Sequence, residues 1–295
     1  MLSSLSLLPQ AVVTGILMGL IYGLVAAGLA IIWGVVDIVN FAHGEYMLIA
    51  MFTTVLVSNT FGVDPLLMLP VNVVLLFVIG YLSYTVVISR VINGPIFAQV
   101  LATFALLLIL RYGMLAAFGS QTRTLDSFVF DGRVELLGVA VSLPQLVAAV
   151  FCVAGVGVLY YVLKHTKTGR AIRATAQDRE AARVLGINDD RIFALTWGIG
   201  IAAVAVAGTL AATFYPTQAE TTPEIWTIIA FAAVALGGLG GVLAAVAGGL
   251  IIGLVENMSV TLISSQYRSF YIFAVLLIGL IYSREGILNW VSTHE

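Results

Sequence analysis

Four side chains that can hydrogen-bond or carry charge fall within nine residues of an otherwise apolar stretch: Asp37, Asn40, His43 and Glu45. Ionisable groups at membrane depth are expensive, so they usually face a protein interior or water. Gly44 lies among them, and the polar residues on its two sides cannot all share one helix face. The sequence therefore predicts a short irregular segment whose polar side chains converge.

Two interpretations of this segment remain open. In the first, it lines or gates a translocation path, where Asn40 and His43 offer uncharged hydrogen-bonding groups to an amide or an amino acid. In the second, its polar groups satisfy one another and pin two helix ends as a structural network. A zinc site is not expected, because His43 and Glu45 are two residues apart and the sequence offers no evident third ligand.

The composition places these residues in a membrane protein. Of the 295 residues, 61% are hydrophobic and 9% are charged, whereas soluble domains carry about 25% charged residues. The net charge of −2 argues against nucleic acid as a partner. The single cysteine, Cys152, cannot form an internal disulfide and gives no cluster for a metal. We expect one membrane domain over 1–295, with no catalytic residue and no bound cofactor.

The apolar runs predict an all-α integral membrane protein. They are continuous and do not alternate in ten-residue segments, which favours helices over a barrel. A run of about 20 residues is long enough to cross the bilayer, and the second run is short for a full span. About eight hydrophobic segments are predicted, at 11–36, 44–58, 66–90, 96–118, 141–163, 192–213, 226–256 and 268–283.

Basic residues predict the orientation of these segments, because cytoplasmic loops are enriched in Lys and Arg. The segment 164–191 carries seven basic and four acidic residues, whereas 119–140 carries two basic and three acidic residues. We therefore expect 164–191 in the cytoplasm and 119–140 outside. Arg90 and Arg284 also fit the cytoplasmic side.

The segment 226–256 is long and is interrupted by glycines at LGGLGG. If 192–213 leaves the cytoplasm and 268–283 returns to it, the segment between them starts and finishes outside. A re-entrant hairpin of two half-helices meeting at mid-depth satisfies that requirement. The alternative is one long tilted helix with small residues for close packing. We group the glycines of the break with the path or gate: Gly237, Gly238, Gly240 and Gly241.

Other charged residues near the apolar runs receive smaller roles. Arg111 falls late in the 96–118 run and is expected to snorkel outward. Glu224 lies in an external segment that is either solvated or touches a substrate-delivery protein. Glu256 and Asn257 close the glycine-rich block, where a cap or a packing contact is favoured over a substrate contact.

The segment 164–191 is a charged interruption between apolar runs. Its part 170–185 contains good helix formers and no proline, and Gly169 and Gly186 flank it, which predicts one bounded helix. Small residues share one face, which suits a helix docked in a groove. The alternative is a surface loop beside anionic lipid headgroups. Asn188 is expected to cap the following span.

Three blocks of the sequence resemble the branched-chain amino acid permease family of ABC importers. The motif EAAxxxG at 180–186, within GRAIRATAQDREAARVLGINDDRIFAL, resembles the EAA loop of importer permeases. The blocks NFAHGEYMLIAMF at 40–52 and FAAVALGGLGGVLAAVAGGLIIGLVEN at 231–257 are similar to the same family, more to its LivH-like half than to its LivM-like half. The three blocks occur in the family's order.

The resemblance implies a transport subunit and not an enzyme, with ATP and Mg²⁺ used by partner subunits. The implied partners are a related but different permease chain, two cytoplasmic ATPase subunits and an extracytoplasmic solute-binding protein, in a bacterial or archaeal cytoplasmic membrane. The substrate would be a branched-chain or other amino acid, or a small amide-like solute such as urea. The implied ATPase-coupling residues are Gly169, Arg170, Arg173, Glu180, Ala181, Ala182, Leu185 and Gly186.

The residues by themselves keep a second class of transporter open. The chain has no GxxxxGK[ST] motif, so it supplies no nucleotide-binding loop of its own. An ion-gradient-driven secondary transporter of a small polar solute would use the re-entrant hairpin and the membrane carboxylates Asp37, Glu45 and Glu256. Such a transporter needs no ATPase, and 170–185 would then have no special role.

Overall fold

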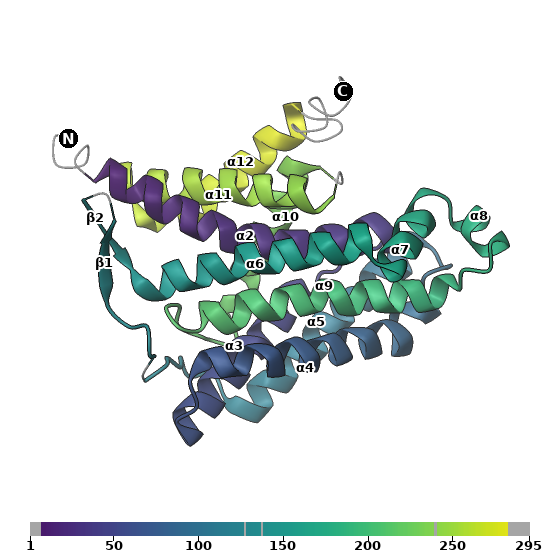
Figure 1. Cartoon of the computed structure of the whole chain (residues 1–295), viewed down its shortest axis with the longest axis horizontal. Coiled ribbons are helices and arrows are strands. Elements are labelled where there is room, and N and C mark those ends of the chain that lie inside the picture. Colours follow the sequence, from purple (N-terminus) through teal and green to yellow (C-terminus); the bar gives the residue numbers. More distant parts are fainter. Residues whose placement is uncertain (1–6, 127, 137, 239–240, 283–295) are drawn as a thin grey trace.

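The computed structural model describes residues 7–126, 128–136, 138–238 and 241–282, which form a bundle of helices with one small β-hairpin (Figure 1). The predicted all-α class is confirmed for this part of the chain, and the hairpin was not predicted. The elements are α2 (Leu8–Val36), α3 (His43–Phe61), α4 (Pro65–Val86), η1 (Ile88–Arg90), α5 (Ile96–Phe118), β1 (Arg133–Leu136), β2 (Val139–Ser142), α6 (Leu143–His165), α7 (Lys167–Gln177), α8 (Arg179–Val184), α9 (Asp189–Ala211), α10 (Thr222–Gly237), α11 (Val242–Leu262), η2 (Ser265–Tyr267) and α12 (Arg268–Tyr282).

Six helices in the described residues are long and apolar enough to cross a membrane. They are α2, α4 with η1, α5, α6, α9 and α11. The positions of the apolar runs agree with helices in the structure, but the count of eight hydrophobic segments is not confirmed. Helix α10 is apolar but has only 16 residues.

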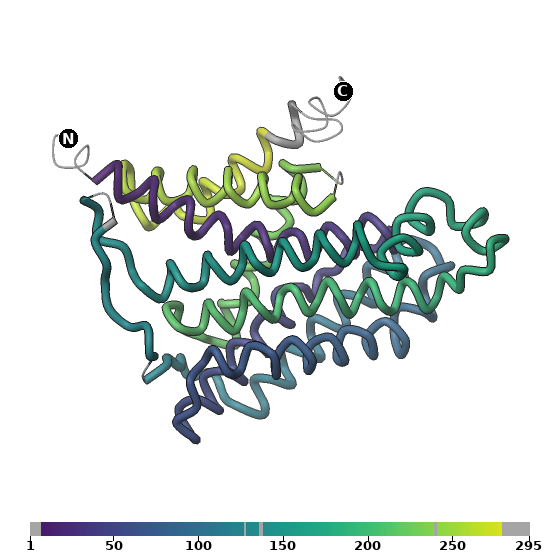
Figure 2. The backbone as a smooth tube through the Cα atoms, viewed as in Figure 1, coloured from purple at the N-terminus to yellow at the C-terminus, as the bar shows by residue number. Residues whose placement is uncertain are grey.

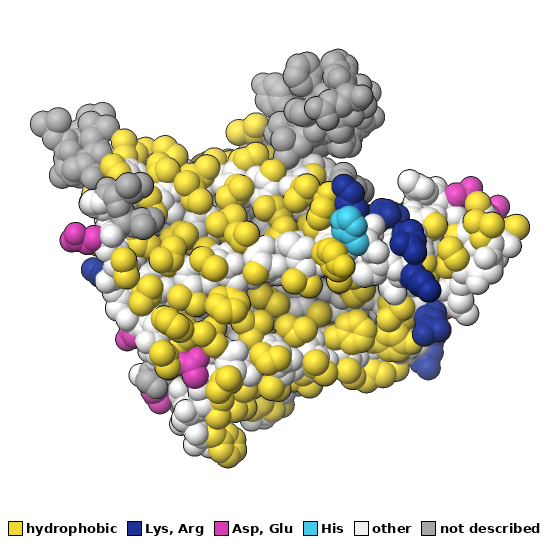
Figure 3. Space-filling view, in the orientation of Figure 1, with side chains coloured by type: hydrophobic (Ala, Val, Ile, Leu, Met, Phe, Trp, Pro, Cys, Tyr) yellow, Lys and Arg dark blue, Asp and Glu magenta, His cyan; other side chains and the backbone are white. Residues whose placement is uncertain are grey.

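The two ends of the bundle differ in charge. Helices α7 and α8, with the adjoining ends of α6 and α9, form what we call the basic end, where Lys and Arg side chains gather (Figure 3). The antiparallel strands β1 and β2 and the start of α2 lie at the opposite end (Figure 2). The predicted separation of 164–191 from 119–140 is therefore present in the fold. Arg284 lies outside the described residues.

Helix α2 is the centre of the bundle. In its most apolar stretch 89% of the residues are buried, compared with 17% for α5, 22% for α6 and 28% for α4. Helix α9 is the second most buried of these spans. Helices α4, α5 and α6 therefore form the periphery, and their exposed Leu, Val and Phe side chains suit contact with lipid or with another apolar protein surface.

Glycines bring α2 and α11 into direct backbone contact. Gly15, Gly19 and Gly23 recur every four residues on α2, so they share one face of the helix. That face meets Gly249 and Gly253 of α11, and a methyl group at Gly19 would lie 2.8 Å from the Leu250 Cα. Such close approach is how helices associate in lipid, where hydrophobicity gives no preference for helix contacts.

We expect Gly19→Leu to lower the thermal unfolding midpoint in detergent, because overpacking a close contact costs about 1–3 kcal/mol. Gly157→Leu on α6 is the matched control, since a methyl group at Gly157 would meet no atom within 4 Å. Equal losses of stability in the two variants would contradict the packing argument.

The chain breaks after α2 and re-enters the bundle before it becomes helical again. Asp37 ends α2 in a left-handed conformation with φ of 57°, and residues 37–42 are not helical. His43 then begins α3, and its Nε2 lies 2.9 Å from the carbonyl oxygen of Val25. Val25 is roughly 16 Å before the end of α2. Helix α3 therefore starts inside the bundle, which explains why this apolar run is short.

A second break after α9 brings α10 to the same place. Residues 212–221 contain no helix, and Thr222 begins α10. The Gly44 amide donates to the Thr227 hydroxyl over 3.0 Å, and a methyl group at Gly44 would collide with the carbonyl oxygen of Pro223. The starts of α3 and α10 therefore lie against each other, and glycine is required at their contact.

The glycine-rich break separates α10 from α11, with positive φ at Gly238 and Gly241. The two helices pack antiparallel, since Gly237 meets Ala244 and Gly248 meets Ala233. The segment is thus a hairpin and not one long helix. Two half-helices meeting at mid-depth are not confirmed, because α11 has 21 residues, enough to cross a bilayer, and Gly241 lines a groove at the basic end. Gly240 lies outside the described residues.

Candidate functional site

Arg111 on α5 joins the starts of α3 and α10. Its Nε and Nη2 donate to Oε1 of Glu45 over 2.9 and 2.7 Å. Its Nη1 donates to Oε1 of Glu224 over 2.7 Å. We call Arg111, Glu45 and Glu224 the charged triad. The triad connects three helices that are far apart in sequence, and it does so where the two short helices begin.

The triad is buried on one side and open on the other. The exposed fraction of the side chain is 1% for Glu45, 17% for Arg111 and 58% for Glu224. The Arg111–Glu45 pair is therefore a buried ion pair, in which each partner compensates the other's desolvation. Glu224 holds the third position at a surface of this chain.

The depth of the triad restricts what can cover its open side. Arg111 lies seven residues before the end of α5 at Phe118, roughly 10 Å along the helix axis. Neighbouring α5 side chains are apolar and exposed, including Ile109 and Tyr112. A charged group at this depth is too costly to face lipid hydrocarbon. We therefore expect water or another protein to cover this face.

The polar residues around the first break do not converge on one open site. Asn40 and His43 are fully buried, and both bond to backbone: Asn40 Oδ1 accepts from the Ala42 amide over 3.1 Å, and His43 pairs with Val25. Asp37 is exposed at the basic end, where it lines a cavity of about 530 Å³ together with Arg179. Of the four predicted residues, Glu45 is the one that enters the triad.

The expected irregular stretch is partly confirmed. Residues 37–42 are irregular, whereas His43, Gly44 and Glu45 form the first turn of α3. The network alternative needed polar side chains that satisfy one another, but these hydrogen bonds run to backbone or to Arg111.

Two residues of the triad received other roles from the sequence. Arg111 was expected to snorkel outward, but it points to Glu45 and Glu224. Glu224 was placed in an external loop, but it lies in the first turn of α10. The available signal was an unpaired charge of each sign in apolar runs, since such charges pair inside membrane proteins. Glu256 likewise pairs with Arg268.

The segment 164–191 at the basic end, which we call the coupling segment after the role that the resemblance implies, contains two helices and not one. Asp178 interrupts the predicted helix with an extended backbone, φ −154° and ψ 104°, and its Oδ1 accepts from the Ala181 amide over 2.9 Å. Asp178 therefore caps α8. Gly169 does not precede the first helix but lies within α7, where a side chain would collide with the α6 backbone at Val162 and Leu163.

Two predicted caps of this segment are confirmed. Gly186 has φ of 83°, and its amide donates to the Arg183 carbonyl over 2.9 Å, as at a helix C-terminus that ends in glycine. Asn188 Oδ1 accepts from the Arg191 amide over 2.9 Å at the start of α9. Both ends of the α8–α9 connection are thus set by local sequence.

The coupling segment presents apolar side chains to the outside. Val184 and Leu185 are 87% and 79% exposed, whereas Ala182 is buried against this chain. The predicted face of small residues is split, because its members Ala171 and Ala174 are half-buried whereas its member Ala181 is exposed. The remaining predicted coupling residues that are exposed are Arg170, Arg173, Glu180 and Gly186.

An ion-pair cluster that the sequence analysis missed holds α8 against α9. Asp189 Oδ2 accepts from Arg179 Nε over 2.5 Å and from Arg183 Nη2 over 2.6 Å. Arg179 also reaches Asn93 Oδ1 over 3.3 Å, in the turn before α5. We call these contacts the Asp189 clamp. The clamp ties α8 to α9 and to the turn before α5.

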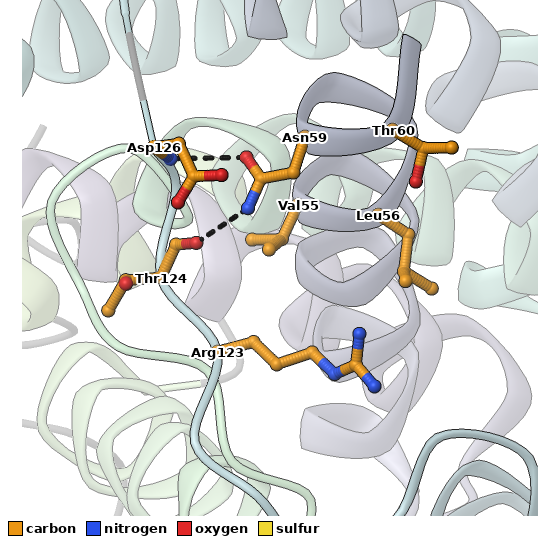
Figure 4. A pocket seen from close by; sticks show the side chains of 7 residues that line it. All are labelled: Val55, Leu56, Asn59, Thr60, Arg123, Thr124 and Asp126. Carbon is orange, nitrogen blue, oxygen red and sulfur yellow. Dashed lines mark hydrogen bonds between the residues drawn. The ribbon is translucent and has the colours of Figure 1, made fainter. Parts of the chain in front are cut away.

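A smaller cavity of about 270 Å³ lies at the opposite end, between the end of α3 and the segment after α5 (Figure 4). Asn59 makes both hydrogen bonds drawn there, from its Nδ2 to the Thr124 carbonyl over 2.9 Å and from the Asp126 amide to its Oδ1 over 3.1 Å. Arg123 pairs through its backbone with Thr217, just before α10. The segment after α5 thus connects α3 with the approach to α10.

Comparisons with known proteins identify the family of this chain. Residues 11–281 match the family model described as branched-chain amino acid transport system / permease component. The high-affinity branched-chain amino acid transport system permease protein LivH of Escherichia coli K12 is 29% identical, with 95% of each chain covered. The corresponding permease protein BraD of Pseudomonas aeruginosa has the same identity and coverage.

A solved structure shows the same fold at low sequence identity. PsaBC from Streptococcus pneumoniae in complex with Fab matches with a TM-score of 0.50 and 11% identity over 100% of both chains. The likeness concerns the fold alone. With six candidate spans, the chain is a multi-pass protein of the cytoplasmic membrane. Because the family model covers nearly the whole chain, the protein belongs to the branched-chain amino acid transport system permease family.

Proposed function

We propose that this chain is the membrane-spanning subunit of an ATP-driven importer for branched-chain or other amino acids, or for a small amide-like solute such as urea. The chain itself performs no catalysis. ATP and Mg²⁺ act in two cytoplasmic ATPase subunits, a related but different permease chain completes the membrane part, and an extracytoplasmic protein delivers the solute. The names of the relatives support the amino acid class.

The observation that carries the proposal is the coupling segment. Helix α8 extends from the basic end of the bundle (Figure 1) and exposes Val184 and Leu185. Exposed apolar side chains beside charged ones suit contact with a soluble partner. The Asp189 clamp gives that contact a connection to α9 and to the turn before α5. Movement of an ATPase subunit would thus reach the transmembrane helices through a short, rigid link.

The charged triad supports a translocation path that runs past its open side. Its open side needs water or protein cover at membrane depth, and a path between two permease subunits supplies both. Helices α3 and α10, which begin at the triad, would form the movable part of that path, with the two breaks as hinges. Asn40 and His43 would then support α3 from behind and not contact the solute in this conformation.

Uptake by the reconstituted importer in vesicles tests the proposal. Gly186→Pro removes an amide donor and imposes a negative φ at a position with φ of 83°. Gly62→Pro is the matched control, because Gly62 has φ of 64° and donates to the Ser58 carbonyl at the end of α3. We expect Gly186→Pro and Arg170→Glu to abolish ATP-dependent uptake and Gly62→Pro to retain it.

The alternative is a secondary transporter driven by an ion gradient. Such a transporter would also use the membrane carboxylates, but α7 and α8 would have no special role in it. If uptake by the Gly186→Pro and Arg170→Glu variants persists after ATP depletion, the ATP-driven proposal is wrong. Loss of uptake on collapse of the proton or sodium gradient would support the alternative.

A further inference from the structure

An open groove of about 780 Å³ lies between α2, α6, α7 and the start of α11. Its walls are mostly apolar, with Ile31 and Val35 from α2 and Val242 and Leu243 from α11. Among its described lining residues, the charged side chains are Lys164 and Arg173, both basic and both exposed. The volume lies in the range of pockets that hold a small organic ligand, about 300–1,000 Å³.

We propose that this groove binds an anionic phospholipid of the cytoplasmic leaflet. The phosphate would lie between the Lys164 ammonium and the Arg173 guanidinium, and an acyl chain would lie along the apolar wall. The ligand must be both anionic and apolar, because the groove offers two positive charges at its rim and aliphatic side chains below them. A free phosphate would satisfy the rim alone.

The two basic side chains are held where a headgroup would meet them. Lys164 donates to the Tyr160 hydroxyl over 2.7 Å and lies over the Tyr160 ring. Arg173 donates to the Leu163 carbonyl. Both anchors belong to the last turns of α6, so the two cations are held beside the same end of that helix. The start of α11 faces the same groove, and its capping residue Gly241 has no side chain to cover the helix N-terminus, which favours an anion there.

The groove is separate from the apolar tip of the coupling segment. Neither Val184 nor Leu185 lines it. The bound lipid would contact α7 on one wall and α11 on the other, so it would stabilise the position of the coupling segment relative to the α10–α11 hairpin. The inference uses the proposed cytoplasmic orientation of the basic end. It is tested by binding, so its outcome does not depend on which solute the importer carries.

Native mass spectrometry of the purified importer with its partner subunits measures how much of each lipid the groove retains. Dioleoylphosphatidylglycerol and dioleoylphosphatidylcholine are added at equal concentrations, and the lipid retained is counted. We expect preferential retention of the anionic lipid and its loss by about fivefold for each of Lys164→Gln and Arg173→Gln, the effect of one cation near an anionic surface. Lys167→Gln is the matched control, an exposed base on the same segment that does not line the groove.

Further measurements distinguish a bound lipid from other occupants of the groove. Leu243→Asn should weaken retention without changing the rim charges, because Leu243 lines the apolar wall. Inorganic phosphate at the same concentration should not displace the lipid. Equal retention of the two lipids, an equal loss in Lys167→Gln, or displacement by phosphate would each overturn the proposal. Retention in the isolated chain alone, and not in the assembled importer, would assign the groove to a partner subunit and overturn it as well.

Discussion

Replacing Arg111 with methionine is expected to lower the free energy of unfolding by about 3 kcal/mol and to reduce uptake to the level seen without ATP. The change leaves Glu45, 1% exposed, as a buried carboxylate without its partner, and breaking such a pair costs about 3–5 kcal/mol. The lower value applies because Arg111 is 17% exposed. Thermal unfolding in detergent and vesicle uptake measure the two effects.

The double variant Arg111→Met/Glu45→Met separates stability from transport. Replacing both partners of a buried ion pair by apolar side chains is often neutral or stabilising, so stability should return while uptake stays low. Glu224→Gln should change stability by less than about 1 kcal/mol, since Glu224 is 58% exposed. Full uptake in the double variant would show that the triad is structural and has no part in the path.

The second large effect is expected from Asp189→Asn, which weakens both hydrogen bonds from Arg179 and Arg183. Without these ion pairs, α8 is joined to α9 through residues 185–188 alone, so force from an ATPase subunit would reach the transmembrane helices less effectively. We expect ATP-dependent uptake to fall by about fivefold or more, the lower part of the range for coupling between two sites. ATP hydrolysis should persist, so the ratio of solute to ATP is the quantity to measure.

Asp190→Asn is the matched control for this change. It removes the same charge from the same helical turn, but Asp190 is exposed, and among the described residues its side chain accepts a 3.4 Å hydrogen bond from Tyr84. An equal fall in coupling in both variants would mean that charge at the start of α9 matters and that the clamp does not.

The features that depend on residues close together in the chain could be predicted from the sequence. The helices lie within a few residues of the apolar runs, and the caps at Gly186 and Asn188 follow from local hydrogen bonding. The depth at which α3 starts could not be predicted in this way, because it depends on a contact with Val25 in another helix. The split at Asp178 had a local signal, an N-cap residue in the middle of a predicted helix, which the small-residue pattern obscured.

The pairing partners within the charged triad could not be predicted from one sequence. Arg111 is 66 residues from Glu45 and 113 residues from Glu224 in the chain. Composition and spacing show that each charge needs a partner, but only the packing of α5 against α3 and α10 selects the partners. The same holds for the Asp189 clamp, in which Asp189 pairs with two arginines, Arg179 and Arg183.

The meeting of α3 and α10 at their starts has an electrical consequence. Each helix carries a macrodipole of about half a positive charge at its N-terminus, and each has a carboxylate, Glu45 or Glu224, in its first turn. With the single charge of Arg111, the positive and negative contributions are close to balance. If the proposed path runs past the triad, a zwitterion would enter it without changing the net charge there. A singly charged ion would add an uncompensated charge at membrane depth, where that addition is most costly.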